Sequence, residues 1–262
     1  MFVKGVNAMS LDSYEDILKY RAAGSIIAQA DKNQGDSANR EGVFVTLTTL
    51  AGKYPYNEFA MDRFRSVVIP ALKVGFGTYR RGVTPGEWYT KPDNFTRDQR
   101  AMLEMGMAVS GMNRELFESM LKIILRGGFH QNTRHGTDDP KNRWKVPDII
   151  TPGQMTTYIR GLATSKLAQM ATQPILMLLD LGLLVDIGLR GDSHDIDNML
   201  ATKMLFDYKV NSTFVSRFAM RKYITTDFLQ KIKENYAEGD EKNGIAPMAD
   251  LFKEAYQRNG LL

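Results

Sequence analysis

Cysteine is absent from this chain of 262 residues. Its absence excludes disulfide bonds, zinc–thiolate sites, cysteine-ligated iron–sulfur clusters and catalysis by a thiolate. Several other signatures are missing as well. The sequence has no phosphate-binding loop of the Walker type, no dinucleotide-binding glycine fingerprint, no nucleophile elbow and no set of protein-kinase motifs. We therefore expect no cofactor.

Long runs of like charge are also missing. The 34 basic and 30 acidic residues are spread along the chain and leave a net charge of +4. A nucleic-acid partner is therefore not favoured. The first residues, Met1 to Val6, lack the apolar region of a signal peptide, so we expect none.

The most apolar segment, residues 174–189, is shorter than the roughly 20 residues that a helix needs to cross a bilayer. It also contains Asp180 and Asp186, and carboxylates are rare in membrane-spanning helices. We expect neither a transmembrane segment nor a membrane partner. We interpret the segment as a helix that is buried on most sides inside the protein.

Helical periodicity dominates the rest of the sequence, and strand signals are scarce. Apolar residues recur every three or four positions in most segments. Thr151, Pro152 and Gln154 form the clearest helix start, because they combine a threonine cap, a proline at the first helical position and a glutamine at the third. Residues 41–51 could form a short helix or a strand, because they are rich in β-branched side chains, which are common in strands. We interpret them as a helix because the preceding turn resembles a helix N-terminus.

Two long polar segments, residues 75–94 and 127–150, are predicted to be loops, and such long loops are usually functional or disordered. No linker rich in proline, glycine or serine divides the chain, so we predict a single all-α domain over residues 1–262. Very apolar and amphipathic helices alternate, with the long loops on one side. We therefore expect helical hairpins arranged in an α/α toroid-like ring, complete or open. A repeat solenoid is disfavoured because the sequence has no fixed period.

Two helix starts carry more polar groups than a helix start requires. Thr96 and Gln99 have the spacing of a capping box, and Arg97 and Asp98 lie between them. The helix dipole favours the acid in the first turn but not the arginine. A second start of this kind contains Asp36, Ser37 and Arg40. We predict that the two starts line a shared pocket.

Asp36 and Asp98 are our candidates for the two carboxyl groups that glycoside hydrolysis commonly needs, one as an acid and one as a base or nucleophile. Arg40 and Arg97 would bind substrate and keep one carboxylate ionised, because a nearby cation lowers the pKa of a carboxyl group by about 1–3 units. The alternative is that both aspartates are ordinary acids at helix starts that stabilise their helices and pair with the arginines.

Side chains in the predicted loops complete the candidate binding site. Trp88 and Tyr89 could stack on a sugar ring, and His130 could contact an anionic group beside its basic neighbours. His130 and His135 lack the helical context and the matching glutamate of a zinc site. An ordinary solvated loop is the alternative.

A compact polar group, Asp195, Asp197 and Asn198, could offer oxygen ligands to calcium. Its spacing lacks the glycine turn and the terminal glutamate of an EF-hand loop. We therefore favour a capped helix start there, and we predict no metal site.

Four short motifs occur in a fixed order along the chain: Gly35-Asp36-Ser37 with Arg40 and Gly42, Pro92-Asp93 with Thr96 to Gln99, Asp148 with Thr151-Pro152, and Asp195 with Asp197-Asn198. This order resembles a group of proteins, many of them phage-encoded, that are similar to α/α-toroid carbohydrate-active proteins of the six-hairpin type. The resemblance covers most of the chain, roughly residues 12 to 258.

The resemblance implies a toroid that binds or cleaves a polysaccharide or glycan, located in the virion or the host cytoplasm. The group often has a His-Pro pair before the second motif, where this chain has Arg80-Arg81-Gly82 and Lys91-Pro92. That difference favours an alternative function as a non-catalytic structural or adaptor component of a phage virion, with other virion proteins as partners. Whether the protein is an enzyme is left open by the sequence.

Overall fold

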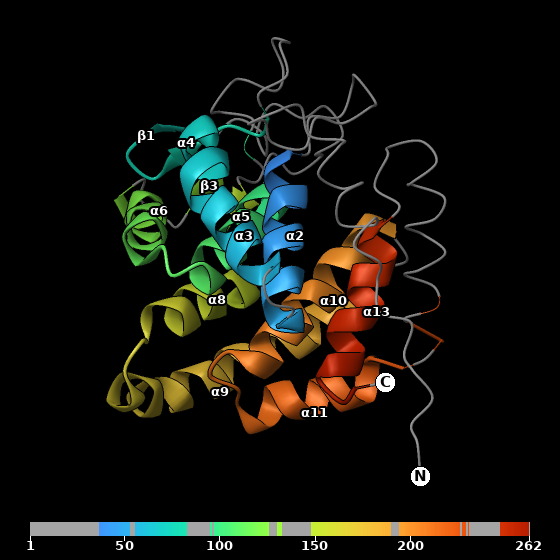
Figure 1. The fold of residues 1–262 in the computed structure, drawn as a ribbon. Coiled ribbons are helices and arrows are strands. Elements are labelled where there is room, and N and C mark those ends of the chain that lie inside the picture. Colours follow the sequence, from blue (N-terminus) through green and yellow to red (C-terminus); the bar gives the residue numbers. More distant parts are fainter. Residues whose placement is uncertain are drawn as a thin grey trace.

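The computed structural model describes the following residues (Figure 1): 37–52, 56–82, 95, 97–125, 130–132, 148–189, 194–225, 227–228, 230 and 247–261. Helices account for most of them, as the prediction of an all-α protein requires. The helices are α2 (Ser37–Ala51), α3 (Tyr56–Arg63), α4 (Ile69–Leu72), α5 (Arg97–Val109), α6 (Asn113–Leu125), α8 (Pro152–Leu162), α9 (Lys166–Leu189), α10 (His194–Lys209), α11 (Phe214–Tyr223) and α13 (Pro247–Arg258).

Short irregular elements fill the predicted loops at their ends. The antiparallel pair β1 (Lys73–Gly75) and β2 (Thr78–Tyr79) follows α4, and the antiparallel pair β3 (His130–Asn132) and β4 (Asp148–Ile149) precedes α8. A π-helical turn, η1 (Phe64–Val68), joins α3 to α4. The backbone keeps right-handed helical angles at Arg63, Val68 and Ile69, so Pro70 lies within a helical segment that runs from α3 through the π-helical turn into α4.

Helices α2 and α5 lie side by side and run parallel. The backbone N–H of Asn39 donates to the Gln99 side chain over 2.9 Å, and three residues further along each helix Gly42 touches the backbone of Met102. Contact partners that advance together along two helices mark a parallel pair. Gly42 makes the contact possible, since a Cβ there would stand 2.1 Å from the Met102 carbonyl oxygen.

Two further helices continue this parallel arrangement. The Tyr158 hydroxyl of α8 reaches Glu104 of α5, and one turn later Gly161 packs against Ala108 and Leu116. On the other side of α8, Lys203 of α10 bonds Thr156. Arg160 of α8 then pairs with Asp207 of α10, four residues further along both helices. The contacts make α2, α5, α8 and α10 four parallel helices that begin at the same end.

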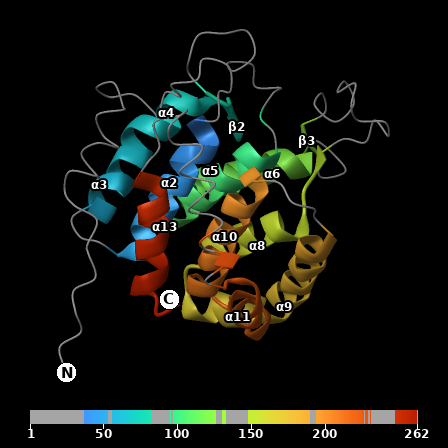
Figure 2. The same ribbon diagram turned by 90° about the vertical axis from the view of Figure 1, so that its right-hand side faces the viewer.

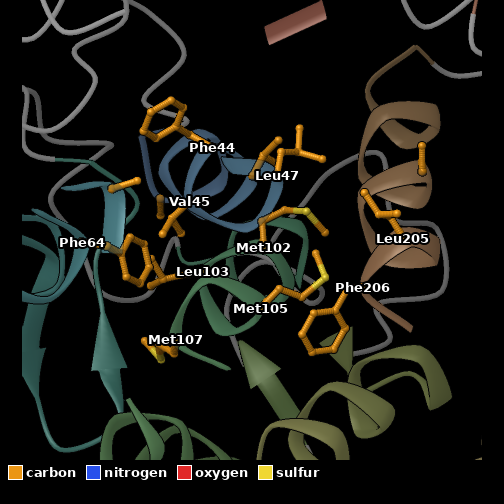
Figure 3. Close-up of a cluster of buried hydrophobic side chains, with 14 of the residues drawn as sticks. Phe44, Val45, Leu47, Phe64, Met102, Leu103, Met105, Met107, Leu205 and Phe206 are labelled. Atoms are coloured by element: carbon orange, nitrogen blue, oxygen red, sulfur yellow. The ribbon is translucent and has the colours of Figure 1, made fainter. Parts of the chain in front are cut away.

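The core lies between these helices and is rich in methionine. Figure 3 shows Met102 and Met105 of α5 between Leu47 of α2 and the pair Leu205 and Phe206 of α10. All five side chains are almost completely buried. Unbranched methionine fills irregular gaps between helices well, which explains why so many are found at helical spacing. Helix α13 closes the core by bonding α10 through Tyr256 and α2 through Asn259.

The prediction that residues 174–189 form a helix buried on most sides is wrong for the described side chains, which end at residue 182. Leu178 is 70% exposed, and Ile175, Met177 and Leu181 are exposed as well. Helix α9 packs antiparallel to α8, and its inward face carries Asp180, which pairs with Arg160. The polar face thus turns inward to satisfy buried charges, and the apolar face points outward. Among the described helices, none combines the length and apolarity needed to cross a membrane.

The finer prediction, a ring of helical hairpins, is not confirmed by these elements and stays a prediction. The hairpins themselves are present in part. Helices α5 and α6 are joined at Gly111, whose φ of 68° suits glycine, and α8 and α9 form the next antiparallel pair (Figure 2). In both pairs a helix of the parallel set is followed by a helix that returns along its outside.

The close approach at Gly42 leads to a stability prediction. Gly42→Ala introduces a methyl group into the α2–α5 contact, and we expect the free energy of unfolding to fall by about 3 kcal/mol or more, because overpacked cores must move backbone to relax. Denaturant unfolding measures the effect. Gly75→Ala is the matched control, since its Cβ would meet nothing nearer than 4.0 Å. Equal stabilities of the two variants would contradict the parallel contact.

Candidate functional site at four helix N-termini

The first turns of the four parallel helices lie together, and we call this region the N-terminal end of the bundle. Asn39 links three of them, because its backbone N–H donates to Gln99 of α5 and its side-chain amide lies 3.1 Å from the sulfur of Met199 in α10. Helix α8 joins through its contacts with α5 and α10. In Figure 1 this end of α2 points to the top of the molecule.

Local chemistry explains why each helix begins here. Thr151 and Gln154 form the predicted capping box of α8, with each side chain bonded to the other residue's backbone N–H. The first N–H groups of α2 are satisfied differently. Ala38 donates to the Arg81 carbonyl over 3.0 Å, and Asn39 donates to Gln99. Because the first turn of any helix has free donors, these contacts from neighbouring segments fix where α2 starts.

All four sequence motifs have described residues at this end. Arg40, half-buried, belongs to the first turns of α2, and Arg97 and Asp98 begin α5. Asp148 begins β4, the strand that precedes α8, and the group from Asp195 to Asn198 lies in the first turns of α10. Four segments far apart in the sequence thus lie together, and a pocket between the two helix starts stays a prediction.

Several predicted site side chains lie outside the described part of the chain. Asp36 precedes the first described residue, Trp88 and Tyr89 fall between described ranges, and of Arg97 and Asp98 only the backbone is described. His130 is described as backbone in β3, where it pairs with Ile149, two residues before the cap of α8. Its strand therefore borders the N-terminal end of the bundle. The roles of these residues remain predictions.

The electrostatics of this end favour negative charge. Each helix has a partial positive charge at its N-terminus, and four parallel helices place these charges side by side. Aspartates occur in or just before the first turn of each helix in the sequence. They fit both interpretations of the sequence: acids that offset the dipoles, and acids held ionised for chemistry. An anionic ligand would be attracted for the same reason.

A buried ion pair beneath Arg40 was missed by the sequence reasoning. The Glu41 carboxylate accepts two hydrogen bonds from the Arg63 guanidinium, over 2.6 and 2.9 Å, and both side chains are buried. This bidentate pair joins α2 to α3. It holds the second turn of α2 in place under the candidate site.

A second buried polar group supports the start of α5. The Arg100 guanidinium lies over the ring of Phe95, 5.1 Å from its centroid, and bonds Ser119 of α6 over 2.7 Å. Glu104, one turn further, accepts from Ser119 and from Tyr158. Burial raises the pKa of the Glu104 carboxyl above its ordinary value, although Arg100 acts in the opposite direction. Phe95 and Arg100 together anchor the segment that enters α5.

A third buried group ties α8, α9, α10 and α11 together. Arg160 bonds Asp180 over 2.8 Å, and its other terminal nitrogen lies 3.1 Å from Asp207, close enough for an ion pair but not aligned as a hydrogen bond. Lys203 bonds Asp207, and the Thr213 hydroxyl at the start of α11 bonds Asp180. Burial lowers the pKa of Lys203 to about 8, against the raising effect of Asp207.

Comparison with known proteins does not add to this description. No family model, no curated protein and no solved structure matches the chain.

The lowered pKa of Lys203 predicts a pH dependence of stability. Its ordinary value is 10.5, so between about pH 8 and 10.5 the unfolded chain binds the proton more strongly than the folded one. The free energy of unfolding then rises with pH by up to about 1.4 kcal/mol per unit from this group. We expect Lys203→Gln to have a flatter profile than the wild type from pH 8 to 9.5, measured by urea unfolding. The buried tyrosines are the same in both proteins and contribute equally to both profiles. Parallel profiles would therefore argue against the lowered pKa of Lys203.

The contact between Asn39 and Gln99 predicts a second effect on stability. Gln99→Met keeps the shape but removes the acceptor of the Asn39 N–H, and we expect a loss of about 1–3 kcal/mol, the usual effect of a buried donor without a partner. Gln99→Glu keeps an acceptor at the positive end of α2 and should lose less. Thermal and denaturant unfolding of the three proteins test this. A methionine variant as stable as the wild type would contradict the proposed role.

Proposed function

We propose that the protein binds a glycan at the N-terminal end of the bundle and cleaves it by acid/base chemistry. One observation carries the proposal: α2 and α5 are parallel neighbours whose first turns are joined by the bond between Asn39 and Gln99. Asp36 directly precedes α2 in the sequence, and Asp98 is the second residue of α5. The two candidate carboxyl groups therefore belong to adjacent helix starts.

The spacing of packed helices suits this chemistry. Neighbouring helix axes lie about 8–10 Å apart, and the Gly42 contact places α2 and α5 at close range. Retaining glycosidases hold their carboxyl groups about 5–5.5 Å apart, and inverting ones about 6.5–9.5 Å apart. Side chains on two adjacent first turns can reach either separation. The four N-terminal dipoles favour the ionised form of one carboxyl group.

The order of the helices supports the toroid part of the proposal. In a ring of helical hairpins the inner helices run parallel and the returning helices lie outside. Helices α2, α5, α8 and α10 are parallel here, and α6 and α9 return along the outside of α5 and α8. Each of the four motifs of the phage-encoded group has residues in, or shortly before, one of these parallel helices. We infer the carbohydrate substrate from that resemblance. The location of the protein in the virion or the host cytoplasm is inferred from it as well.

Hydrolysis of bacterial polysaccharides tests the catalytic assignment. We expect the wild-type protein to release reducing ends from at least one polysaccharide of a panel. Asp36→Asn and Asp98→Asn should each lower the rate by about 10²–10⁴-fold, the usual contribution of a positioned acid or base. Asp227→Asn is the control, because Asp227 is exposed and follows α11, away from the site.

Two results would overturn the proposal. Release that survives both substitutions would remove Asp36 and Asp98 from the mechanism. Absence of release on every glycan, together with co-purification with phage particles, would favour the structural or adaptor function instead. A binding measurement with the asparagine variants separates the two parts of the proposal, since loss of rate with retained glycan binding assigns the carboxyl groups to catalysis alone.

A further inference from the structure

Helix α9 presents an unusual outward face. Between residues 167 and 181 every exposed position is apolar, and the six large side chains are Leu167, Met170, Ile175, Met177, Leu178 and Leu181. Ala171 and Pro174 complete the stripe. The stripe is about 21 Å long at 1.5 Å per residue. A soluble monomer rarely exposes a continuous apolar surface of this size without a function.

Between residues 167 and 181 the polar side chains of the same helix are buried or half-buried. Gln173 bonds Asn211 over 2.7 Å, Thr172 bonds the backbone within α9, and Asp180 pairs with Arg160 and Thr213. The orientation of α9 is therefore held by buried hydrogen bonds and ion pairs. Turning the apolar stripe inward would expose Asp180 and leave the buried guanidinium of Arg160 without this partner, which is strongly unfavourable.

Helix α11 lies beside α9, as both views show at the lower margin of the molecule (Figures 1 and 2). It exposes Phe214, 69% accessible, and Phe218, one turn later. Cationic side chains alternate with these rings. Arg217 and Arg221 are exposed, and the Lys222 ammonium lies 5.8 Å from the centre of the Phe218 ring. The sequence of α11 contains no Asp or Glu.

The exposed charged side chains described on α9, at the end of α10 and on α11 are all basic. Exposed cations flank it at the start of α9, at the end of α10 and along α11: Lys166, Lys209, Arg217, Arg221 and Lys222. The described carboxylate of α9, Asp180, is buried inside the protein. An apolar surface that has aromatic rings and these basic side chains beside it complements a partner with an apolar interior beneath an anionic surface.

We propose that the outward faces of α9 and α11 dock onto an anionic lipid bilayer. Apolar side chains enter the boundary between headgroups and acyl chains, and the surrounding Lys and Arg residues contact lipid phosphates. The proposal concerns binding at the membrane surface, not a span. It replaces the expectation that the protein has no membrane partner, and it does not depend on the proposed glycan chemistry.

Two observations favour a bilayer over a protein partner. Docking of a second copy on this face would bring the same basic residues against one another, and like charges across an interface oppose association. The exposed positions of the stripe also offer no side chain that can form a hydrogen bond, whereas specific protein interfaces contain about one hydrogen bond per 100–200 Å². Lipid acyl chains require none.

Docking in this way would orient the molecule. Helix α2 begins at the top of Figure 1, and α9 and α11 lie at the lower margin. The N-terminal end of the bundle would then face away from the lipid.

Vesicle flotation with the full chain tests the proposal. We expect binding to phosphatidylcholine vesicles that contain phosphatidylglycerol, and weaker binding to pure phosphatidylcholine. Salt should weaken the binding without abolishing it, because the apolar contribution is not screened. Leu178→Glu should lower partitioning about tenfold or more. Leu125→Glu on α6 is the matched control, since Leu125 is 69% exposed and Leu178 is 70% exposed.

A second pair of variants tests the charges. Arg217→Gln with Arg221→Gln should weaken binding to the anionic vesicles about fivefold for each cation removed, with little change on neutral vesicles. Lys253→Gln, an exposed cation on α13, should have no such effect. Circular dichroism establishes that each variant is folded.

The proposal fails if the wild type does not bind anionic vesicles, or if Leu178→Glu and Leu125→Glu bind equally. Sedimentation equilibrium tests the alternative that a second copy of the chain binds this face. Self-association that Leu178→Glu disrupts, without vesicle binding, would assign the face to a second copy of the chain. Asp36→Asn and Asp98→Asn should bind vesicles as the wild type does, so this proposal and the glycan proposal can fail separately.

Discussion

The buried guanidinium of Arg160 is the constraint on which the rest of the fold depends. An isolated charge in a protein interior is very unfavourable, so Arg160 requires anionic partners from more than one element. Asp180 and Asp207 supply them and thereby fix α9 and α10 against α8. One consequence is the parallel alignment of α8 with α10. Another is the orientation of α9, whose single described carboxylate must point inward and whose leucines and methionines must then point outward.

The same arrangement explains the location of the candidate site. Parallel neighbours begin at a common end, so the first turns of α2, α5, α8 and α10 lie together. The glycine at position 42 sets the distance between α2 and α5, and the bond from Asn39 to Gln99 sets their register. The geometry of the site is therefore determined largely by packing below it.

Local features of the fold were predictable from the sequence, because caps and periodicity act over a few residues. The capping box of Thr151 and Gln154 is present, the β-branched segment after residue 41 is helical, and Gly111 joins α5 to α6. Contacts between distant segments were not predictable. Gln99 suggested a cap for its own helix, and it also bonds a neighbouring one. The charge on Asp180 was interpreted as an interruption of an apolar run, although a lone carboxylate on an apolar helix also marks the face that turns inward. For the candidate carboxyl pair, the prediction extends only to two helix starts that lie next to each other, and not to the positions of the side chains.

Four dipoles that point the same way also repel one another laterally, so the bundle carries an electrostatic strain that a hydrophobic core alone does not relieve. Any negative group held at the shared positive pole acts as a counterion and reduces that strain. Ligand binding and bundle cohesion are then thermodynamically linked. An anionic molecule that occupies this pole would raise the melting temperature by an amount that grows with the logarithm of its concentration relative to its Kd, even if no bond in it is ever broken.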